Sequence, residues 1–343
     1  MKNNEYKLTI GLEIHAQINT KSKLFSQSKS DGCDEPNKNV SLIDLGLPGA
    51  LPRLNEEIVK KAILASLALN GTINKNAKFD RKHYFYPDSP LGYQITQFFH
   101  PVCLGGYIEL SNKIIHLDHF HIETDAGKMV HMNNSNSYVD FNRTGIPLIE
   151  IVTKPEIESV EEFKEFINEL ILRLRYIDVC DCNMELGNFR IDTNISISKD
   201  HKKLGTRVEI KNLNSVRFAI DAINYEYQRQ VELINSGGNV IQETRGFNSD
   251  TGETFIMRSK EDFLDYAYMP DFNIPPMDIS DELIDEVHKT LPEMPNYRRL
   301  RYEYLGESTR EVLVSDIRLS DFFDEAARNL LDGNIIANLI TTD

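Results

Sequence analysis

Carboxylate and imidazole side chains recur at strand-like spacing in this chain of 343 residues. Between Leu8 and Ile18 every second residue is apolar, and the positions between them include Glu13 and His15. Residues two apart on a β-strand share a face, so this segment predicts a strand that presents a carboxylate beside an imidazole. A solvent-facing outer surface is the alternative, because half-exposed antiparallel strands often show the same alternation.

Four later segments repeat the pattern with equally polar residues. They are residues 119–125, with His119, His121, Glu123 and Asp125 on one face; 146–152, with Glu150; 189–197, with Arg190 and Asp192; and 207–211, with Arg207, Glu209 and Lys211. A solvent face accepts Lys, Thr, Ser and Glu in any order. Repeated Glu, His, Asp and Arg at strand centres instead indicate one face of a sheet that lines a charged cleft.

Oxygen donors dominate the candidate ligands on this face. The set comprises Glu13, Glu123, Glu150 and Glu209 together with His15, and it favours Mg²⁺ or Mn²⁺ over zinc. The His119-x-His121 pair is the competing signal for zinc. Cations that would complete a phosphate site are Lys128, Arg143, Arg190, Lys211, Arg245, Arg258 and Lys260. Because Mg²⁺ in enzymes usually bridges phosphate groups, the combination predicts ATP-dependent phosphoryl transfer.

The elements that position these residues form an α+β fold. Helices are expected after the Asn55 cap, over 159–177 behind a Ser159 capping box, and after Ser215. They should back the apolar faces of a largely antiparallel sheet. Residues 79–90 hold two prolines and several aromatic residues, so we expect a ligand-binding loop there. We place a first domain at 1–292, which the family resemblance described below implies to be a cradle domain, and the start of a helical domain at 293–343.

Bulk properties exclude several classes of protein. The net charge of −15 argues against broad non-specific nucleic-acid binding. No apolar run approaches the roughly 20 residues of a membrane span, and the N-terminus has no apolar signal segment, so we expect a cytoplasmic protein. The four cysteines have no zinc-binding spacing and are expected to be reduced thiols.

Ordered runs along the chain identify a family resemblance. The runs begin with Ile10–His15, Leu45–Pro52, Phe79–Asp88 and Gly92–Gln97, and continue with His121–Lys128, Asn142–Ile151, Glu209–Ser215 and Gln242–Arg245. The chain resembles the B subunits of the aspartyl/glutamyl-tRNA(Asn/Gln) amidotransferases. Matches from about residue 7 onward, in order, make this resemblance specific.

The resemblance implies a ligase that acts on misacylated tRNA. ATP would phosphorylate the side-chain carboxylate of Glu-tRNA(Gln) or Asp-tRNA(Asn), and ammonia from a separate amidase (glutaminase) partner would displace the phosphate. A small third partner would complete a heterotrimer, and a C-terminal tail domain that helps to bind tRNA would follow the helical domain. We expect that tail domain to lie outside these 343 residues.

The family's site residues fall on specific positions of this chain. The resemblance implies Mg²⁺ ligands at His15, Glu123 and Glu150, with Glu13 beside them. Catalytic or nucleotide, acyl and metal contacts would come from Arg190, Asp192, Glu209, Lys211, Asn212 and Arg245. Their physical task would be charge neutralisation and positioning, because phosphoryl transfer asks little covalent chemistry of the protein.

Three departures from the family pattern affect these expectations. The paired cysteines of a zinc knuckle are replaced by Ser26-Gln-Ser28 and Ser41-Leu-Ile-Asp44, which predicts that no zinc is bound there. Leu91 and Ala267 stand where the family usually carries a lysine and an arginine. A non-catalytic tRNA-binding scaffold and an unrelated small-molecule carboxylate–amine ligase are the alternative functions.

Overall fold

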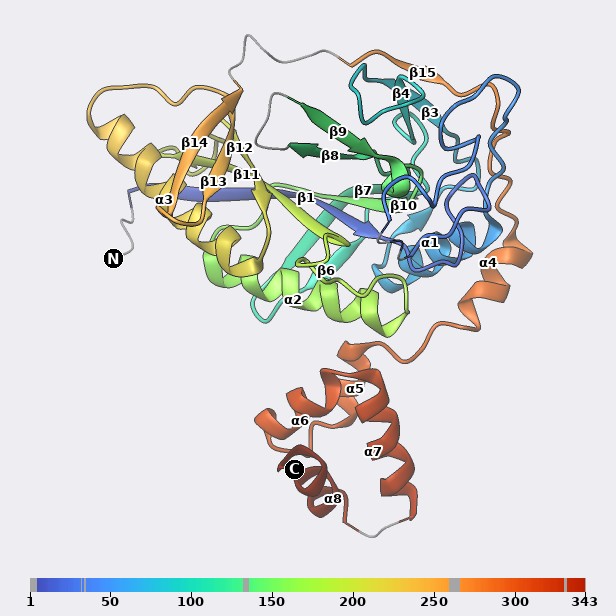
Figure 1. Ribbon diagram of the computed structural model, residues 1–343. Helices are drawn as coiled ribbons and strands as arrows, with labels where there is room; N and C mark the ends of the chain where they lie inside the picture. Colours follow the sequence, from blue (N-terminus) through green and yellow to red (C-terminus); the bar gives the residue numbers. More distant parts are fainter. Residues whose placement is uncertain are drawn as a thin grey trace.

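The computed structural model describes residues 5–31, 33, 35–131, 136–258, 266–329 and 332–342. Its main element is a ten-stranded, mostly antiparallel sheet, in which only the contact between β12 and β13 is parallel among the described pairings (Figure 1). In spatial order the strands are β14 (Glu253–Arg258), β13 (Glu243–Asn248), β12 (Val208–Leu213), β11 (Phe189–Ser198), β1 (Lys7–Gln17), β10 (Pro147–Thr153), β7 (Ile114–Thr124), β5 (Cys103–Leu104) and β2 (Thr72–Ile73), with β6 (Tyr107–Glu109) also paired to β7. This arrangement confirms the α+β fold class.

Three helices cover the apolar face of the sheet. They are α1 (Glu56–Ala68), α2 (Val160–Tyr176) and α3 (Val216–Asn235), each within a few residues of its expected position. The predicted caps form: Ser159 accepts a hydrogen bond from the Glu162 amide at 3.1 Å, and the amide of Glu158 donates to the Glu162 side chain. Such an N-cap stabilises a helix by about 1 kcal/mol, which helps to fix where α2 begins.

Packing of α2 on β1 decides which face of the sheet is polar. Phe163, Phe166 and Leu170 of α2 are fully buried in the same core as Ile10 and Ile14 of β1. Because strand residues alternate, Glu13 and His15 must then point to the opposite face. The apolar stripe of the helix and the alternation of the strand therefore specify the same orientation.

Smaller elements stand over the polar face. The sheet β15–β3–β4 is formed by β15 (Tyr268–Pro270), β3 (Asp80–His83) and β4 (Tyr93–Thr96), and a hairpin is formed by β8 (Lys128–His131) and β9 (Ser137–Asp140), followed by the short helix η1 (Phe141–Arg143). The expectation of a loop across 79–90 was wrong for its first residues, which form β3. Their strand partners lie at 93–96 and 268–270, too far along the chain for local alternation to reveal them.

A helical segment follows the sheet. After α4 (Asp281–His288) come α5 (Pro295–Arg301), α6 (Glu307–Val314), α7 (Ile317–Asn329) and α8 (Gly333–Thr342). This segment has its own small core, which includes Tyr302, Leu313 and Phe323, and Figure 1 shows it beside the sheet rather than within it. The boundary at residue 292 stays a prediction. Among the described residues, no helix has both the length and the apolar character needed to cross a lipid bilayer.

Candidate active site

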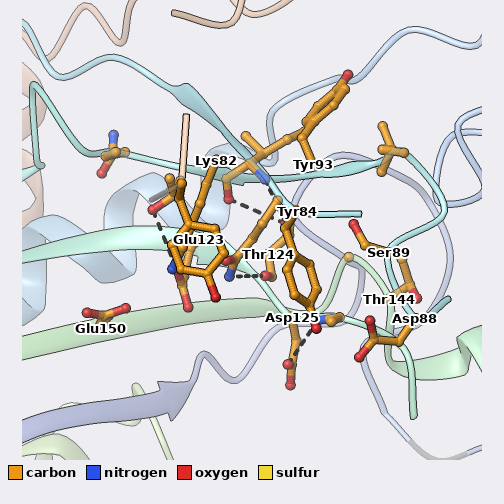
Figure 2. Close-up of a pocket in the computed structure, with 18 of the residues that line it drawn as sticks. Lys82, Tyr84, Asp88, Ser89, Tyr93, Glu123, Thr124, Asp125, Thr144 and Glu150 are labelled. Carbon is orange, nitrogen blue, oxygen red and sulfur yellow. Dashed lines mark hydrogen bonds between the residues drawn. The ribbon is translucent and has the colours of Figure 1, made fainter. Parts of the chain in front are cut away.

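A cavity of about 1080 Å³ lies on the polar face of the sheet. Its floor comes from β1, β7, β10, β11 and β12, and the sheet β15–β3–β4 supplies a wall with Lys82 and Tyr268. Figure 2 shows Lys82, Tyr84 and Tyr93 standing on that wall, across from Glu123 and Glu150. Seven of the predicted site residues line the cavity: Glu13, His15, Glu123, Glu150, Arg190, Glu209 and Lys211.

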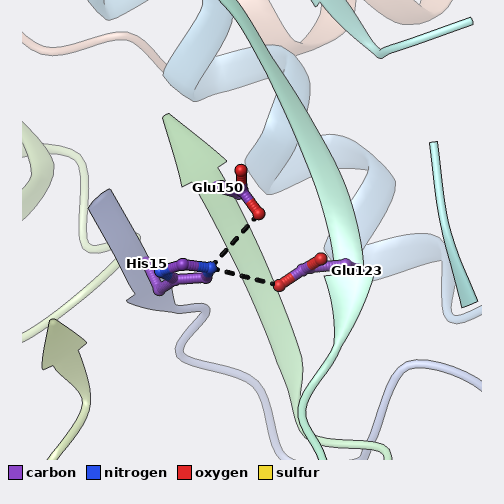
Figure 3. A group of neighbouring side chains, drawn as sticks. All are labelled: His15, Glu123 and Glu150. Atoms are coloured by element: carbon purple, nitrogen blue, oxygen red, sulfur yellow. Dashed lines mark ion pairs between the residues drawn. The ribbon is translucent and has the colours of Figure 1, made fainter. Parts of the chain in front are cut away.

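His15, His121, Glu123 and Glu150 form an imidazole–carboxylate cluster on three adjacent strands. The strand register pairs His15 with Glu150, and Glu150 with His121, across β1, β10 and β7. His15 Nε2 lies 3.2 Å from Glu150 Oε2 and 3.5 Å from Glu123 Oε1 (Figure 3). His121 Nε2 lies 3.6 Å from Oε2 of each glutamate. Pairing of strands distant in sequence thus brings the four side chains together.

Electrostatics within the imidazole–carboxylate cluster favour the charged forms. Burial opposes protonation of His15, but hydrogen bonding and attraction to Glu150, with added attraction to Glu123, outweigh it and raise the His15 pKa to about 9. The pKa of His121 is raised for the same reasons. Although burial opposes ionisation of Glu150, the two imidazoles hold its pKa far below the ordinary value. Without a metal ion, protons on imidazole therefore balance the buried carboxylates.

The donor set of this cluster fits a divalent cation. One ligand atom each from His15, Glu123 and Glu150 can lie within 4.8 Å of the others, which is close enough to share one ion. His121 has a buried Nδ1 without a hydrogen-bond partner among the described residues, and its ring stacks on that of His119. Two carboxylates and an imidazole suit Mg²⁺ or Mn²⁺. His119 Nδ1 lies 2.8 Å from Asp118 Oδ2, and its ring stacks on that of His121 with centroids 5.5 Å apart, so the preference for Mg²⁺ over zinc stays a prediction.

A lysine–carboxylate cluster, made of Lys211, Asp192 and Glu209, occupies the neighbouring part of the floor. Lys211 Nζ lies 2.9 Å from Asp192 and 3.1 Å from Glu209. Burial opposes the charge on Lys211, but attraction to the two carboxylates raises its pKa above the ordinary value. The hydroxyl of Thr244 also donates to Glu209, at 2.7 Å. A single ammonium group therefore faces two carboxylates and offsets part of their negative charge.

Glu13 and Arg190 connect the two clusters. Glu13 accepts a hydrogen bond from Asn194 at 3.1 Å, and its pKa is raised by burial and then by the nearby charges of Glu150 and Glu209. Arg190 makes two hydrogen bonds to Asp125, at 3.0 and 3.2 Å. Its guanidinium is thereby fixed at the edge of the cavity, where a planar fork can also contact phosphate or carboxylate oxygens.

Three predicted site residues do not line the cavity. Asp192 binds Lys211 on the polar face, next to the lining residues, whereas Arg245 and Asn212 lie elsewhere. Arg245 pairs in register with Ile210 of the apolar face, and its guanidinium binds Glu243 and Thr254 beside Glu226 of α3. Asn212 adopts a left-handed backbone (φ 64°) and its amide faces Met257. The expectation that Arg245 and Asn212 contact a cofactor is not supported by these positions. Alternation along β13 places Thr244, not Arg245, on the cavity side.

The other cations predicted for a phosphate site are not all free to bind a ligand. Lys128 is exposed, and Arg143 donates to the carbonyl oxygens of Ala126 and Gly127. The side chain of Arg258 and all of Lys260 lie outside the described residues. In the expected ligand loop, Arg81 pairs with Asp271, whereas Lys82 lines the cavity.

Sequence reasoning also missed residues of the cavity. Thr96 lies 3.5 Å from Glu123, and Phe98 and Tyr268 line the cavity. Arg207, which the alternation placed on the same face as Glu209, also lines it. Nothing in the pattern around Thr96 or Phe98 distinguishes either from a residue of an ordinary loop.

Comparisons with known proteins place the chain in a family. A family model described as the GatB/GatE catalytic domain matches residues 8–285. The B subunit of the aspartyl/glutamyl-tRNA(Asn/Gln) amidotransferase of Rickettsia rickettsii is 47% identical over 348 aligned residues, which cover 99% of this chain and 72% of that protein. The protein of the same name from Orientia tsutsugamushi is 45% identical, with 98% and 71% covered. The chain therefore belongs to the family of amidotransferase B subunits.

Proposed function

We propose that this chain is the subunit of a tRNA-dependent amidotransferase that activates and amidates the side chain of a misacylated amino acid. The substrate would be Glu-tRNA(Gln), Asp-tRNA(Asn) or both. The observation that carries the proposal is the convergence of His15, Glu123 and Glu150 inside a cavity that also holds Lys82, Arg190 and Lys211. Family membership supplies the reaction class.

The proposed reaction has two steps. In the first, a carboxylate oxygen of the aminoacyl side chain attacks the γ-phosphorus of ATP, the bond to ADP breaks, and an acyl phosphate forms. In the second, the nitrogen of ammonia attacks the acyl carbon, the C–O bond to phosphate breaks, and inorganic phosphate leaves. The nitrogen loses a proton, and the product is the amide. Positioning and charge stabilisation are what such a reaction requires of the protein.

The residues of the cavity can provide both. His15, Glu123 and Glu150 would hold Mg²⁺, which when bound supplies charge neutralisation for phosphate oxygens. Lys82 stands opposite these glutamates; burial opposes its charge, but attraction to Glu123 and other nearby groups raises its pKa, so it stays charged beside them. Arg190 would contact a phosphate or the substrate carboxylate from the opposite edge. Glu13, with its raised pKa, is suited to receive the proton released by ammonia.

Ammonia would come from a partner protein. Burial raises the pKa of the Cys103 thiol to about 12, and Cys180 and Cys182 are also buried, so these three are poor candidates for a glutaminase nucleophile. We infer a complex with a separate amidase, which would release ammonia from glutamine, and with a small third protein, as the family resemblance implies. Misacylated tRNA is the substrate of that complex in this proposal.

The decisive experiment uses the assembled complex with ATP, glutamine, Mg²⁺ and misacylated tRNA. The natural chain should form ADP and amidated aminoacyl-tRNA in equal amounts. Glu150→Gln keeps the side-chain size but removes the charge, and it should abolish both products while circular dichroism and complex assembly stay unchanged. Glu185→Gln, at an exposed site outside the cavity, is the matched control.

Other outcomes would contradict the proposal. Binding of misacylated tRNA by the natural chain without ADP formation would indicate a scaffold. ADP formation that does not respond to misacylated tRNA would indicate a ligase for a small molecule. Full activity of Glu150→Gln would show that the reaction does not depend on metal binding by this cluster.

A further inference from the structure

An aromatic stack stands at the wall of the cavity and has no role in the reaction steps above. Phe98 follows β4 and Tyr268 begins β15, and both line the cavity. Their rings lie nearly parallel, 17° apart, with centroids separated by 3.9 Å. Phe99 meets Phe98 edge-on at 5.0 Å. A rigid, layered aromatic surface is therefore built into the cavity wall.

This stack is open to a further ring. Phe98 remains 54% exposed although Tyr268 covers one side of it. The exposed fraction is high for a phenylalanine whose ring is already stacked, and such apolar surface next to a binding cavity usually contacts a ligand. Planar aromatic rings stack favourably on nucleobases, because every base has a π-face.

The stack also lies one short chain step from the imidazole–carboxylate cluster. Thr96 Oγ1 is 3.5 Å from Glu123 Oε2, and Phe98 follows Thr96 by two residues. At about 3.3 Å per residue of extended chain, the backbone of Phe98 begins roughly 7 Å from that of Thr96. A base stacked on Phe98 and an aminoacyl group at the imidazole–carboxylate cluster can thus belong to a single aminoacylated nucleotide.

We propose that the Phe98–Tyr268 stack binds the terminal, unpaired base of the tRNA acceptor end, and so positions the attached aminoacyl group at the cluster. This inference rests on the proposed function. The aminoacyl group is esterified to the last nucleotide of tRNA, so its base must lie within one nucleotide of the reacting carboxylate. Unpaired bases at RNA ends are commonly recognised by stacking on aromatic side chains.

The surroundings favour an RNA strand over the adenine of ATP. Further aromatic rings stand on the adjacent loop after β3, where Tyr84 lines the cavity and stacks on Tyr86 at 5.7 Å. Phe85, between them, is 85% exposed, and Tyr86 is 49% exposed. A lone adenine needs one stacking surface, whereas successive bases of a single strand use several.

The test replaces Phe98 in the assembled complex. Phe98→Ala should lower kcat/KM for misacylated tRNA about 5- to 150-fold, which corresponds to the usual contribution of one stacked base. The KM for ATP should stay within about twofold. Phe98→Tyr keeps the aromatic face and should retain activity. Phe322→Ala, which removes a ring of similar exposure (59%) on α7 outside the cavity, is the control.

A modified substrate makes the test specific. A misacylated tRNA whose last nucleotide lacks its base, prepared by chemical acylation, should react as poorly with the natural chain as normal tRNA does with Phe98→Ala. Combining the two changes should cause no further loss, because they remove the same contact. The proposal would be overturned if the losses from the two changes multiplied when combined. It would also be overturned if Phe98→Ala left kcat/KM for tRNA unchanged, or raised only the KM for ATP. Failure of the natural chain to amidate tRNA would instead contradict the proposed function.

Discussion

The imidazole–carboxylate cluster and the lysine–carboxylate cluster differ in which cations lie next to their carboxylates. In the imidazole–carboxylate cluster, Glu123 and Glu150 have imidazoles as their nearest partners. In the lysine–carboxylate cluster, Asp192 and Glu209 have the ammonium group of Lys211, at 2.9 and 3.1 Å. An imidazole that gives up its proton when a metal ion binds can serve as a ligand, whereas the ammonium group of Lys211, with its raised pKa, stays protonated.

This difference assigns separate tasks to adjacent strands. The imidazole–carboxylate cluster can exchange a proton for a divalent cation, which makes it the exchangeable part of the site. The lysine–carboxylate cluster already contains a cation, the ammonium group of Lys211, which lines the cavity. A variant in the lysine–carboxylate cluster should therefore leave metal binding by the imidazole–carboxylate cluster intact, and a variant in the imidazole–carboxylate cluster should leave the ion pairs of Lys211 intact.

The largest expected effect is on the exchangeable cluster. Glu123→Gln should reduce amidation and ADP formation at least about 100-fold, because losing a charged group that stabilises the transition state commonly costs that much. The fold should persist, since glutamine has a similar volume and can still accept a hydrogen bond from Thr96. Product assays with the assembled complex, together with a melting curve, measure both effects. If Glu123→Gln keeps at least half the natural rate, Glu123 does not contribute to the reaction.

A smaller, structural effect is expected at the lysine–carboxylate cluster. Lys211→Met leaves two carboxylates without their cation, and breaking a buried pair costs about 3–5 kcal/mol. The Lys211 side chain is 39% exposed, so solvent screening should reduce the cost to about 1–2 kcal/mol, or about 2–4 °C in Tm. Binding of divalent metal should persist. If metal binding is lost while Tm is unchanged, the two clusters do not have separate tasks.

The pH dependence of stability should also distinguish the clusters. His15 has a pKa raised from 6.5 to about 9, so the folded protein binds this proton more tightly than the unfolded chain. The resulting stability is complete below about pH 6.5 and is lost as the pH rises through about 9. In the presence of a chelator, Tm should fall across this range, and His15→Gln should flatten the fall. A Tm that rises over the same range in the natural chain only would contradict the assignment.

The smallest effect is expected just beyond Lys211. Asn212 has a left-handed backbone with φ 64°, which glycine adopts at less cost. Asn212→Gly should therefore change stability by less than about 0.5 kcal/mol and leave amidation unchanged, since the Asn212 side chain faces Met257. Urea titration and the product assay measure these quantities. If Asn212→Gly lowers activity by more than about tenfold, the original prediction that Asn212 contacts a ligand would be supported.

Local patterns predicted the faces of the strands but not their neighbours. Alternation placed Glu13 and His15 on one face because one side of β1 must pack against α2. It gave no measure of the distance from His15 to Glu123, which depends on β10 lying between β1 and β7. The family resemblance supplied that grouping, and the approach of the three ligand atoms to within 4.8 Å of one another agrees with it.

The prediction for Arg245 was wrong because its side chain pairs with residues on the helix-covered face of the sheet, not with residues of the cavity. Arg245 looked like a free cation, but its partners Glu226 and Thr254 come from α3 and β14. A buried arginine that pairs with residues of distant elements cannot be told from a ligand contact by composition. The wall residues Thr96 and Phe98 were missed for the converse reason, because their role depends on the position of β4 over β7.

The most direct test of the central claim is a titration with Mn²⁺, followed by electron paramagnetic resonance, on the natural chain and on Glu150→Gln. We expect the natural chain to bind an ion that Mg²⁺ displaces, Glu150→Gln to lose that ion, and Glu185→Gln to retain it. Equal Mn²⁺ binding, in number and affinity, by the natural chain and Glu150→Gln would contradict the account.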